Sequence, residues 1–146
     1  MSELRIERDL AFLVSVVGRM AHASTSRAVA ATGLQAVDLL TLQLLATRGR
    51  VLSATLAQLL GVQPSAVTPV TTRLVSAGLI SREQDRCDRR RWWLTLTAQG
   101  RDTLNQAYDL LDDDVFPPLT ALTDDDRERL VDLLGSVLTH AGGGSS

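Results

Sequence analysis

The sequence predicts a mainly α-helical fold that carries a small β-hairpin, and three observations indicate it. Apolar residues recur at helical spacing through both ends of the chain. Glycine or proline interrupts these stretches at intervals that suit helices of ordinary length. Two short runs of strand-forming residues flank a polar tip between residues 79 and 97. The expected order is four helices, a strand, the hairpin tip, a second strand and two more helices.

The first half of the chain is expected to form four helices. Apolar spacing and glycine stops place them at residues 8–30, 34–47, 54–60 and 64–77. Ser53 is the expected N-cap of the third helix, which Gly61 ends. Pro64 suits the first position of the fourth helix, where its missing N–H costs nothing. Pro69, one turn further on, removes a helical hydrogen bond and is expected to bend or tighten the helix start.

The hairpin follows the fourth helix. Residues 79–84 and 92–97 are short and fit strands. Successive side chains of a strand point to opposite faces, which separates Trp92 from Trp93. One tryptophan is therefore expected to pack into the hairpin core and the other to face solvent.

Two helices are expected after the hairpin. Thr97 is the predicted cap of a helix over residues 98–114. Thr123, with Asp126 three residues later, resembles a capping box at the start of a last helix that ends near residue 140. The remaining residues, 141–146, are small or flexible and predict a disordered tail.

Length and composition exclude several classes of protein. A chain of 146 residues, 45% hydrophobic and 22% charged, suits one soluble domain. A single cysteine excludes an internal disulfide framework and a multi-cysteine zinc site. No apolar run approaches the roughly 20 residues of a membrane span, and the charged N-terminus lacks a signal-peptide pattern. We therefore expect a cytoplasmic protein with no membrane partner.

The sequence contains none of the common catalytic or cofactor motifs. It has no glycine-rich phosphate loop, no His-Glu-x-x-His zinc motif and no nucleophile-elbow pattern. The acidic runs Asp112–Asp114 and Asp124–Asp126 resemble cation sites, but no oxygen-ligand loop with an internal glycine accompanies them. The second run also suits the positive end of a helix dipole. We expect neither an enzyme nor a bound metal or cofactor.

The small net charge of the chain hides a strong asymmetry. Residues 1–47 hold four Arg and four acidic residues and carry no net charge. Residues 48–101 hold nine Arg and three acidic residues, a net charge of +6, whereas residues 102–146 carry −8 from two Arg and ten acidic residues. The middle third is thus suited to a polyanion, although a solvated basic face would give the same count.

The stretch from residue 62 to 78 is the most distinctive part of this basic third. It contains no acidic residue, whereas surface helices usually mix charges. A short helix and a tight turn at Gly61 precede it, which suggests a helix-turn-helix. Hydroxyls and an amide near a helix N-terminus suit phosphate contacts and base edges in a major groove. The expected outer face consists of Gln63, Ser65, Thr68, Thr72 and Arg73.

An arginine-rich tip follows this helix directly. All 15 basic residues of the chain are arginine, and five of them fall within residues 82–91. They are Arg82, Arg86, Arg89, Arg90 and Arg91. Guanidinium groups stay charged and bind phosphate or guanine through paired hydrogen bonds. Because the tip follows the helix directly in the chain, it is expected to lie beside the helix. A narrow minor groove of DNA attracts an inserted arginine through its enhanced negative potential.

Together these elements resemble the winged helix-turn-helix of the MarR family of bacterial transcription regulators. The likeness extends over about residues 34–104 and depends on several motifs in the family's order. The motifs are Leu56-Ala57, Leu60-Gly61-Val62, Ser65, Val67-Thr68, Arg73-Leu74, Gly78-Leu79-Ile80, Arg82, Asp88-Arg89-Arg90, Leu96-Thr97 and Gly100. Thr68-Pro69 also resembles the organic-hydroperoxide-sensing branch. The reactive cysteine which that branch carries in its first helix is missing here.

The resemblance implies a winged helix-turn-helix lobe with flanking dimerisation helices. Residues 1–33 and 102–140 would form the helical dimerisation region, and residues 34–101 the DNA-binding region. The sequence supports a dimer independently, because the last helix is apolar around too much of its circumference for a simple surface helix. The homodimer would read a pseudo-palindromic double-stranded site, with its two recognition helices about 34–36 Å apart.

Ten residues are the DNA contacts that the resemblance implies. Those in the fourth helix are Gln63, Pro64, Ser65, Thr68, Thr72 and Arg73, and those in the wing are Arg86, Asp88, Arg89 and Arg90. Asp88 would orient an arginine, and Arg90 would reach the minor groove. Arg86 and Arg89 would add phosphate contacts.

Members of the family often bind a phenolic or other anionic effector near the first helix. Arg19 and His22 lie one turn apart there, and Asp38 could pair with either. These three are the expected effector residues of a repressor released by a small molecule. A helix pair that makes only structural hydrogen bonds is the alternative interpretation.

Two other functions stay open from the sequence. The winged fold could serve as a protein–protein interaction module, although such a module would have no need to exclude acidic residues from 62–78. Cys87 lies beside Arg86 and near Arg89, and nearby cations raise thiol reactivity, which would suit a redox-responsive regulator. An exposed cysteine with no special role is the alternative to that interpretation.

Overall fold

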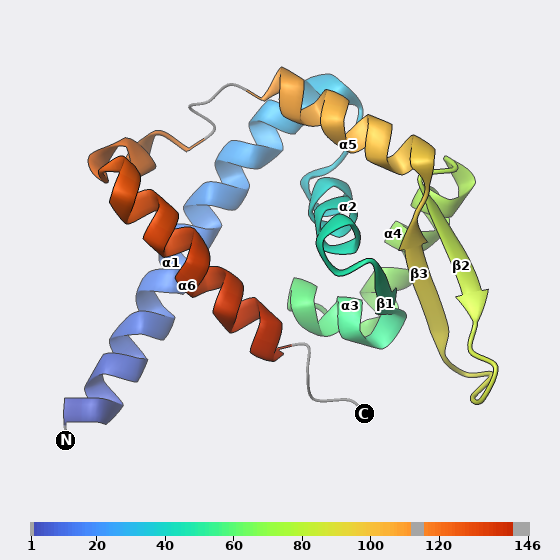
Figure 1. Cartoon of the computed structure of the whole chain (residues 1–146), viewed down its shortest axis with the longest axis horizontal. Helices are drawn as coiled ribbons and strands as arrows, with labels where there is room; N and C mark the ends of the chain where they lie inside the picture. Colours follow the sequence, from blue (N-terminus) through green and yellow to red (C-terminus); the bar gives the residue numbers. More distant parts are fainter. Residues whose placement is uncertain (1, 112–115, 142–146) are drawn as a thin grey trace.

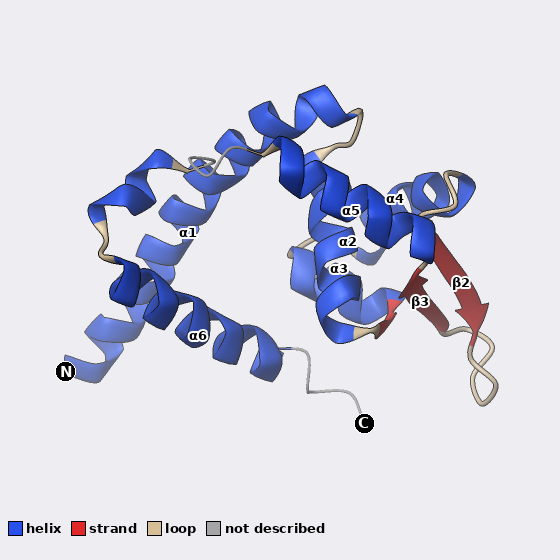
Figure 2. Ribbon diagram, turned by 45° about the horizontal axis from the view of Figure 1, so that its top comes forward, coloured by secondary structure: helices blue, strands red, loops and turns tan. Residues whose placement is uncertain are grey.

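The computed structural model describes residues 2–111 and 116–141 and confirms a mainly α fold with a small β wing. Figure 2 shows how helices dominate these residues, with strands confined to one edge. The helices are α1 Ser2–Val29, α2 Ala36–Arg48, α3 Ser53–Leu60, α4 Pro64–Ser76, α5 Ala98–Leu110 and α6 Asp124–Ala141. The strands are β1 Arg50–Leu52, β2 Ile80–Gln84 and β3 Trp92–Leu96, and two 3-10 turns are η1 Ala30–Thr32 and η2 Pro117–Ala121. None of the described helices is long and apolar enough to cross a membrane.

The elements from α2 to α5 form one lobe, from which α1 and α6 extend (Figure 1). α2 is the centre of the lobe, because it contacts α1, α3, α4 and α5 as well as β1 and β3. The core is built mainly from leucine side chains that are almost fully buried. They are Leu39, Leu42, Leu45, Leu56, Leu74 and Leu94. Burial of these side chains fixes α3, α4 and the sheet against the central helix.

The wing is a three-stranded antiparallel sheet rather than the predicted two-stranded hairpin. The strand order is β1-β3-β2, and Val51 and Arg82 both stand opposite Leu94 of the central strand. β1 spans only Arg50–Leu52, which is too short for an alternating pattern to be recognised in the sequence. β1 follows α2 directly in the chain, so the central strand β3 is hydrogen-bonded on both edges, to β1 on one side and to β2 on the other.

Both predicted threonine caps are confirmed. The Thr97 hydroxyl accepts a hydrogen bond from the Gly100 amide at 3.0 Å, at the start of α5. The Thr123 hydroxyl accepts from the Asp126 amide at 3.2 Å and donates to the Asp126 carboxylate at 2.9 Å. The last two helices therefore begin where the hydroxyl-to-amide spacing placed them.

Several predicted boundaries were wrong by a few residues. α1 begins at Ser2 rather than residue 8. Ser53 is the first residue of α3, and Leu52 takes the N-cap position. Pro69 lies inside α4, which nevertheless runs on to Ser76. The predicted helix end at residues 112–114 and the tail at residues 142–146 lie outside the described residues.

Gly100 fixes the junction between the wing and α5. The Thr97 amide donates to the Leu79 carbonyl at 3.1 Å, and the Thr97 hydroxyl donates to the Gly78 carbonyl at 2.6 Å. These bonds bring the start of α5 so close to the turn before β2 that a Cβ on Gly100 would lie 1.9 Å from the Leu79 carbonyl oxygen. Only glycine fits at this position without movement of the backbone.

Replacement of Gly100 should therefore destabilise the lobe. We expect Gly100→Ala to lower the free energy of unfolding by about 1–3 kcal/mol, because the added methyl group overpacks the junction. Gly135→Ala in α6 is the matched control, since beyond its chain neighbours and the adjoining backbone of its own helix, no described atom lies within 4 Å of the place that the added methyl group would take. That control should be neutral or stabilising. Urea denaturation followed by circular dichroism measures both variants, and equal stability of Gly100→Ala and the wild type would contradict the junction described above.

Candidate nucleic-acid interface

Helices α3 and α4 form a helix-turn-helix around Gly61. Gly61 has φ +66°, in the left-handed region that favours glycine. The Val62 amide donates a hydrogen bond to the Ala57 carbonyl at 3.0 Å, which ends α3 and starts the turn. Val67 and Leu74 then bury the inner face of α4 in the lobe. The opposite face of α4 is left on the surface of the protein.

That outer face is polar and has no acidic side chain. Five of the six predicted DNA contacts in α4 and its N-cap are exposed and uncharged. They are Gln63, Pro64, Ser65, Thr68 and Thr72. Gln63 takes the N-cap position but makes no side-chain hydrogen bond to the helix. Its amide is thus available at the positive end of the helix dipole, next to the Ser65 hydroxyl.

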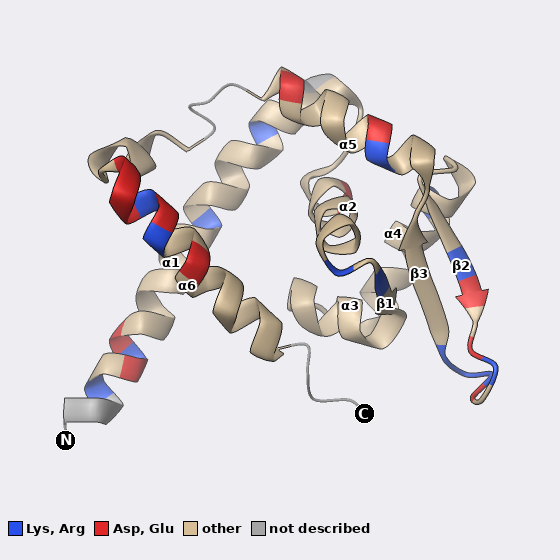
Figure 3. Ribbon diagram, viewed as in Figure 1, with Lys and Arg blue, Asp and Glu red and all other residues tan. Residues whose placement is uncertain are grey.

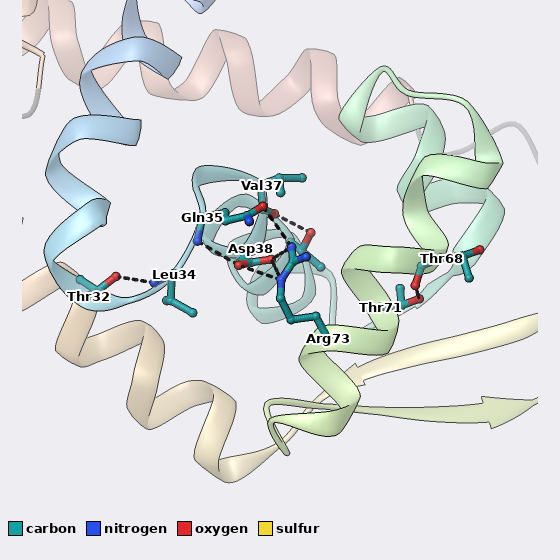
Figure 4. Close-up of polar contacts among 9 residues, drawn as sticks. Thr32, Leu34, Gln35, Val37, Asp38, Thr68, Thr71 and Arg73 are labelled. Carbon is teal, nitrogen blue, oxygen red and sulfur yellow. Dashed lines mark hydrogen bonds and ion pairs between the residues drawn. The ribbon is translucent and has the colours of Figure 1, made fainter.

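Arg73, the sixth predicted contact, is held against α2. Its Nη2 lies 2.5 Å from Asp38 Oδ1, and its Nε lies 3.2 Å from the same oxygen. A further bond joins Nη2 to the side chain of Gln35 at 3.3 Å (Figure 4). Asp38 is only 2% exposed, and its other oxygen accepts from the Gln35 amide at 2.9 Å. The carboxylate therefore caps α2 and holds the only charged side chain of α4.

This ion pair changes the expectation for Asp38. The sequence allowed Asp38 to pair with Arg19 or His22, but the structure pairs it with Arg73 instead. Arg19 and His22 both lie exposed on α1. No hydrogen bond or ion pair joins either of them to Asp38 in the part of the chain that the structure describes. The three expected effector residues are thus not brought together by direct contacts.

Asp85 organises the tip of the wing. Its carboxylate accepts hydrogen bonds from the amides of Cys87 and Asp88, at 2.8 and 2.9 Å, and from the indole of Trp93 at 2.6 Å. The Trp93 hydrogen bond, followed by the two amide bonds, holds the pKa of Asp85 below its ordinary value. Three donors thus order the turn around one ionised side chain.

Asp88 holds Arg90 at the tip. The Arg90 guanidinium lies 3.1 Å from Asp88 Oδ1, and its backbone amide donates to the same oxygen at 3.0 Å. These bonds lower the pKa of Asp88 and raise that of Arg90. Because the Arg90 side chain is still 92% exposed, the pair sets its direction without covering it. Its outward face stays open to a partner.

The other tip residues are open to solvent. Arg86, Arg89 and Cys87 are exposed, and Cys87 carries a free thiol. The Arg89 carbonyl accepts from the Gln84 side chain at 2.6 Å, which closes the tip at its base. Among the described residues, no group of three or more His, Cys, Asp or Glu side chains is arranged to hold a metal ion.

Each tryptophan of the wing lies under an arginine. Arg82 is stacked 4.0 Å from the ring centre of Trp92, and Arg50 is stacked 4.3 Å from that of Trp93. Both tryptophans are half-buried, so the predicted division into one core and one solvent-facing ring was wrong. Arg50 also pairs with Glu83 at 3.7 Å. Arg82 comes from the predicted hairpin itself, whereas Arg50 comes from β1, so the extra strand covers the Trp93 ring.

Positive charge gathers along the wing, and negative charge gathers at the start of α6 (Figure 3). The wing arginines form the end of the lobe that lies furthest from α6 in this view. A polyanion would thus meet α4 and the wing before any acidic cluster that the structure describes.

The comparisons with known proteins agree with this geometry. The family model described as MarR family matches residues 34–92. The HTH-type transcriptional repressor Rv2887 of Mycobacterium tuberculosis is 30% identical over 133 residues, which is 89% of this chain and 96% of the relative. This chain belongs to the MarR family. It is therefore a transcriptional regulator.

Two solved structures show family folds in informative states. A mutant MarR from E. coli in complex with operator DNA has 25% identity and a TM-score of 0.67, and the match covers 89% of this chain and 94% of that one. CouR from Rhodococcus jostii RHA1 bound to p-coumaroyl-CoA has 27% identity and a TM-score of 0.68, with 89% and 92% covered. The winged helix-turn-helix predicted from the sequence is confirmed by these likenesses.

Sequence reasoning did not select Asp85, Arg82 or Arg50 as site residues. Asp85 had a usable signal, because an aspartate at the start of a short turn commonly accepts hydrogen bonds from amides two residues on. Arg82 and Arg50 had no such signal, since their stacking depends on strand register.

The Asp85 network predicts a pH dependence of the wing. A carboxylate whose folded pKa is lowered stabilises the structure above its unfolded pKa, and this contribution is lost as the pH falls through the folded value. The Trp93 indole N–H signal in NMR should therefore shift with a midpoint below 3.8, the ordinary value for Asp. Asp85→Asn should abolish that step and speed hydrogen exchange at the amides of residues 87 and 88. A midpoint at or above 3.8 in the wild type would contradict the network.

Proposed function

We propose that this MarR-family regulator is a homodimeric repressor that binds a pseudo-palindromic double-stranded DNA site and is released by a small-molecule effector. The observation that carries the proposal is the exposed, acid-free face of α4 beside an arginine-bearing wing. Such a face suits a major groove, where hydroxyls and amides bind base edges and phosphates. The DNA complex of the E. coli relative supports the same use of the fold.

In this proposal α4 and the wing take different tasks. Gln63, Pro64, Ser65, Thr68 and Thr72 face the major groove, and Arg90, held by Asp88, enters the adjacent minor groove. Arg86 and Arg89 bind phosphates. Arg73 lies at the edge of the interface with its side chain 41% exposed, so it both anchors α4 and presents its remaining N–H groups to DNA.

The dimer is proposed from the apolar faces of α1 and α6. Phe12 is 66% exposed, Val131 69% and Val137 65%, and no residue of α6 is buried. These values describe a single chain with two long helices whose apolar side chains lack a cover. A second copy of the chain would bury both helices around a two-fold axis, and would set two copies of α4 on one face of the duplex.

The effector is proposed to be a small anionic or phenolic molecule. CouR, a structural neighbour, binds p-coumaroyl-CoA. In this chain Arg19 and His22 offer a cation and a hydrogen-bonding ring on the exposed surface of α1. Direct contact with Asp38 would require the Asp38–Arg73 pair to open. An effector that did so would release the anchor of α4, which couples binding to DNA release.

The function is tested first by selection of bound duplexes from random DNA, followed by titration of the enriched site at two salt concentrations. We expect an inverted repeat whose affinity falls steeply as salt rises, because several phosphates are contacted. Failure of an intact dimer to enrich any sequence would favour the protein–protein interaction module instead.

Variants of the DNA-facing arginines should separate into classes. Arg90→Ala should weaken binding about tenfold and relax the preference at the wing position. Arg73→Ala should weaken binding to the selected site more than Arg127→Ala, which removes a charge from α6, remote from α4 and the wing. Fluorescence anisotropy with the selected duplex measures all three, and equal behaviour of the three variants would show that the interface is wrongly assigned.

Charge placed on the apolar face of α6 should break the dimer. Val137→Asp is expected to shift the sedimenting species from dimer to monomer, because a carboxylate is costly to bury at an interface. Val62→Asp is the control, since Val62 is also exposed and apolar but lies in the DNA-binding lobe. A dimer that persists with Val137→Asp, or a wild-type chain that sediments as a monomer, would contradict the proposed assembly.

A further inference from the structure

A small pocket lies between the C-terminal half of α4 and the first residues of β2. Its volume is about 170 Å³, and Thr71, Thr72, Val75, Ser76 and Arg82 line it. Of these residues only Thr72 belongs to the DNA contacts predicted from the sequence. The pocket therefore extends the described interface from the outer face of α4 toward the wing.

Three of the four polar side chains that line the pocket have no hydrogen-bond or ion-pair partner among the described residues. Thr72 and Ser76 are four residues apart, so their hydroxyls share one face of α4 about 6 Å apart along the helix. The Thr71 hydroxyl donates to the Thr68 carbonyl at 3.1 Å, but no hydrogen bond in the described chain uses the hydroxyl of Thr72 or Ser76. Arg82 likewise makes no ion pair within the described residues.

Nearby acidic groups do not neutralise Arg82. Glu83, the next residue, points to the opposite face of β2, where it pairs with Arg50 at 3.7 Å. Asp85 and Asp88 are engaged at the wing tip with Trp93 and Arg90. The guanidinium in the pocket thus keeps its full positive charge toward solvent.

Trp92 positions this guanidinium. Arg82 is stacked 4.0 Å from the ring centre, and the two residues are diagonal neighbours on adjacent strands, on the same face of the sheet. Stacking holds the flat face of the guanidinium against the ring, and its N–H groups in the guanidinium plane stay available. A flexible side chain is thereby held in one orientation before a ligand arrives, which lowers the entropy cost of binding.

We propose that Arg82, with the hydroxyls of Thr72 and Ser76, binds one phosphate of the DNA backbone. This site depends on the proposed DNA-binding function and adds to it a contact that fixes position rather than sequence. The backbone strand that separates the major groove from the minor groove passes between α4 and the wing. A phosphodiester there offers two anionic oxygens, which match a pair of guanidinium N–H donors and two hydroxyl donors.

The test compares Arg82→Gln with the wild type on the selected duplex and on an unrelated duplex of equal length, over a range of salt concentrations. We expect about a tenfold loss of affinity for both duplexes and a shallower dependence on salt by about one ion, with the preference between duplexes unchanged. Arg82→Lys should keep the salt dependence and lose part of the affinity, because charge is retained without stacking. Arg129→Gln on α6 is the charge-matched control and should behave as the wild type.

Three results would overturn the site. Arg82→Gln with wild-type affinity and salt dependence would remove the site alone and leave the DNA-binding function intact. A changed preference between duplexes with an unchanged salt dependence would show that Arg82 contacts a base. A wild-type chain that binds neither duplex would remove the DNA-binding function and this site with it.

The folded state of each variant is checked by far-ultraviolet circular dichroism and thermal unfolding, because the near-ultraviolet signal of Trp92 would itself change when Arg82 is replaced. If Arg82→Gln fails to fold, Ser76→Ala on the surface of α4 decides the question together with Arg82→Lys. We expect Ser76→Ala to lose about two- to tenfold in affinity for both duplexes, as for one hydrogen bond. Wild-type affinity in both of these variants would overturn the proposal.

Discussion

The buried carboxylate of Asp38 is the constraint on which the DNA-facing surface depends. It is the only charged side chain among the buried residues that the structure describes, and a buried charge is stable only when it is paired and hydrogen-bonded. Three groups satisfy it: the Gln35 amide, at the start of α2, and the Nε and Nη2 of Arg73, from the C-terminal half of α4. Withdrawal of Arg73 would leave the carboxylate partly unpaired in the core, so α4 is held to α2 at a defined position.

That link gives α2 a mechanical role. The same helix contacts α1 and α5, and the α1 end is fixed there by the fully buried Val29. A change in the position of α1 would therefore act on α2, and through the Asp38–Arg73 pair on α4. In the proposed regulation this ion pair would be the element that opens, because a pair with a partly exposed arginine opens at lower cost than the leucine core rearranges.

In the proposed DNA complex, the groups that would contact bases and the charged groups that would contact phosphates lie mainly on different elements. The outward groups of α4 and its N-cap include hydroxyls, an amide and a proline, whereas the wing beside them carries arginines that make no ion pair among the described residues. Phosphate contacts supply affinity that is independent of sequence, and base contacts supply discrimination. The two aspartates of the wing would repel DNA if they were free. They are instead engaged by Trp93 and Arg90, so their charges order the tip.

The extent to which the sequence predicted this arrangement follows from the range of each interaction. Helix starts at Thr97 and Thr123 and the turn at Gly61 depend on residues a few positions apart, and these were predicted correctly. β1 was missed because three residues carry no periodic signal, and its pairing with β3 joins segments more than forty residues apart. The partner of Asp38 was missed for the same reason, since Arg73 is 35 residues away.

The recognised family motifs placed α4 and the wing together, but strand register and ion pairing decide which arginines lack an ion-pair partner. Arg73 was expected to point outward and is anchored, whereas Arg82, which in the sequence is one member of a basic run, is oriented by Trp92 and left without an ion-pair partner among the described residues. The long-range contacts therefore determine how the cationic side chains are divided between holding the fold and binding a polyanion.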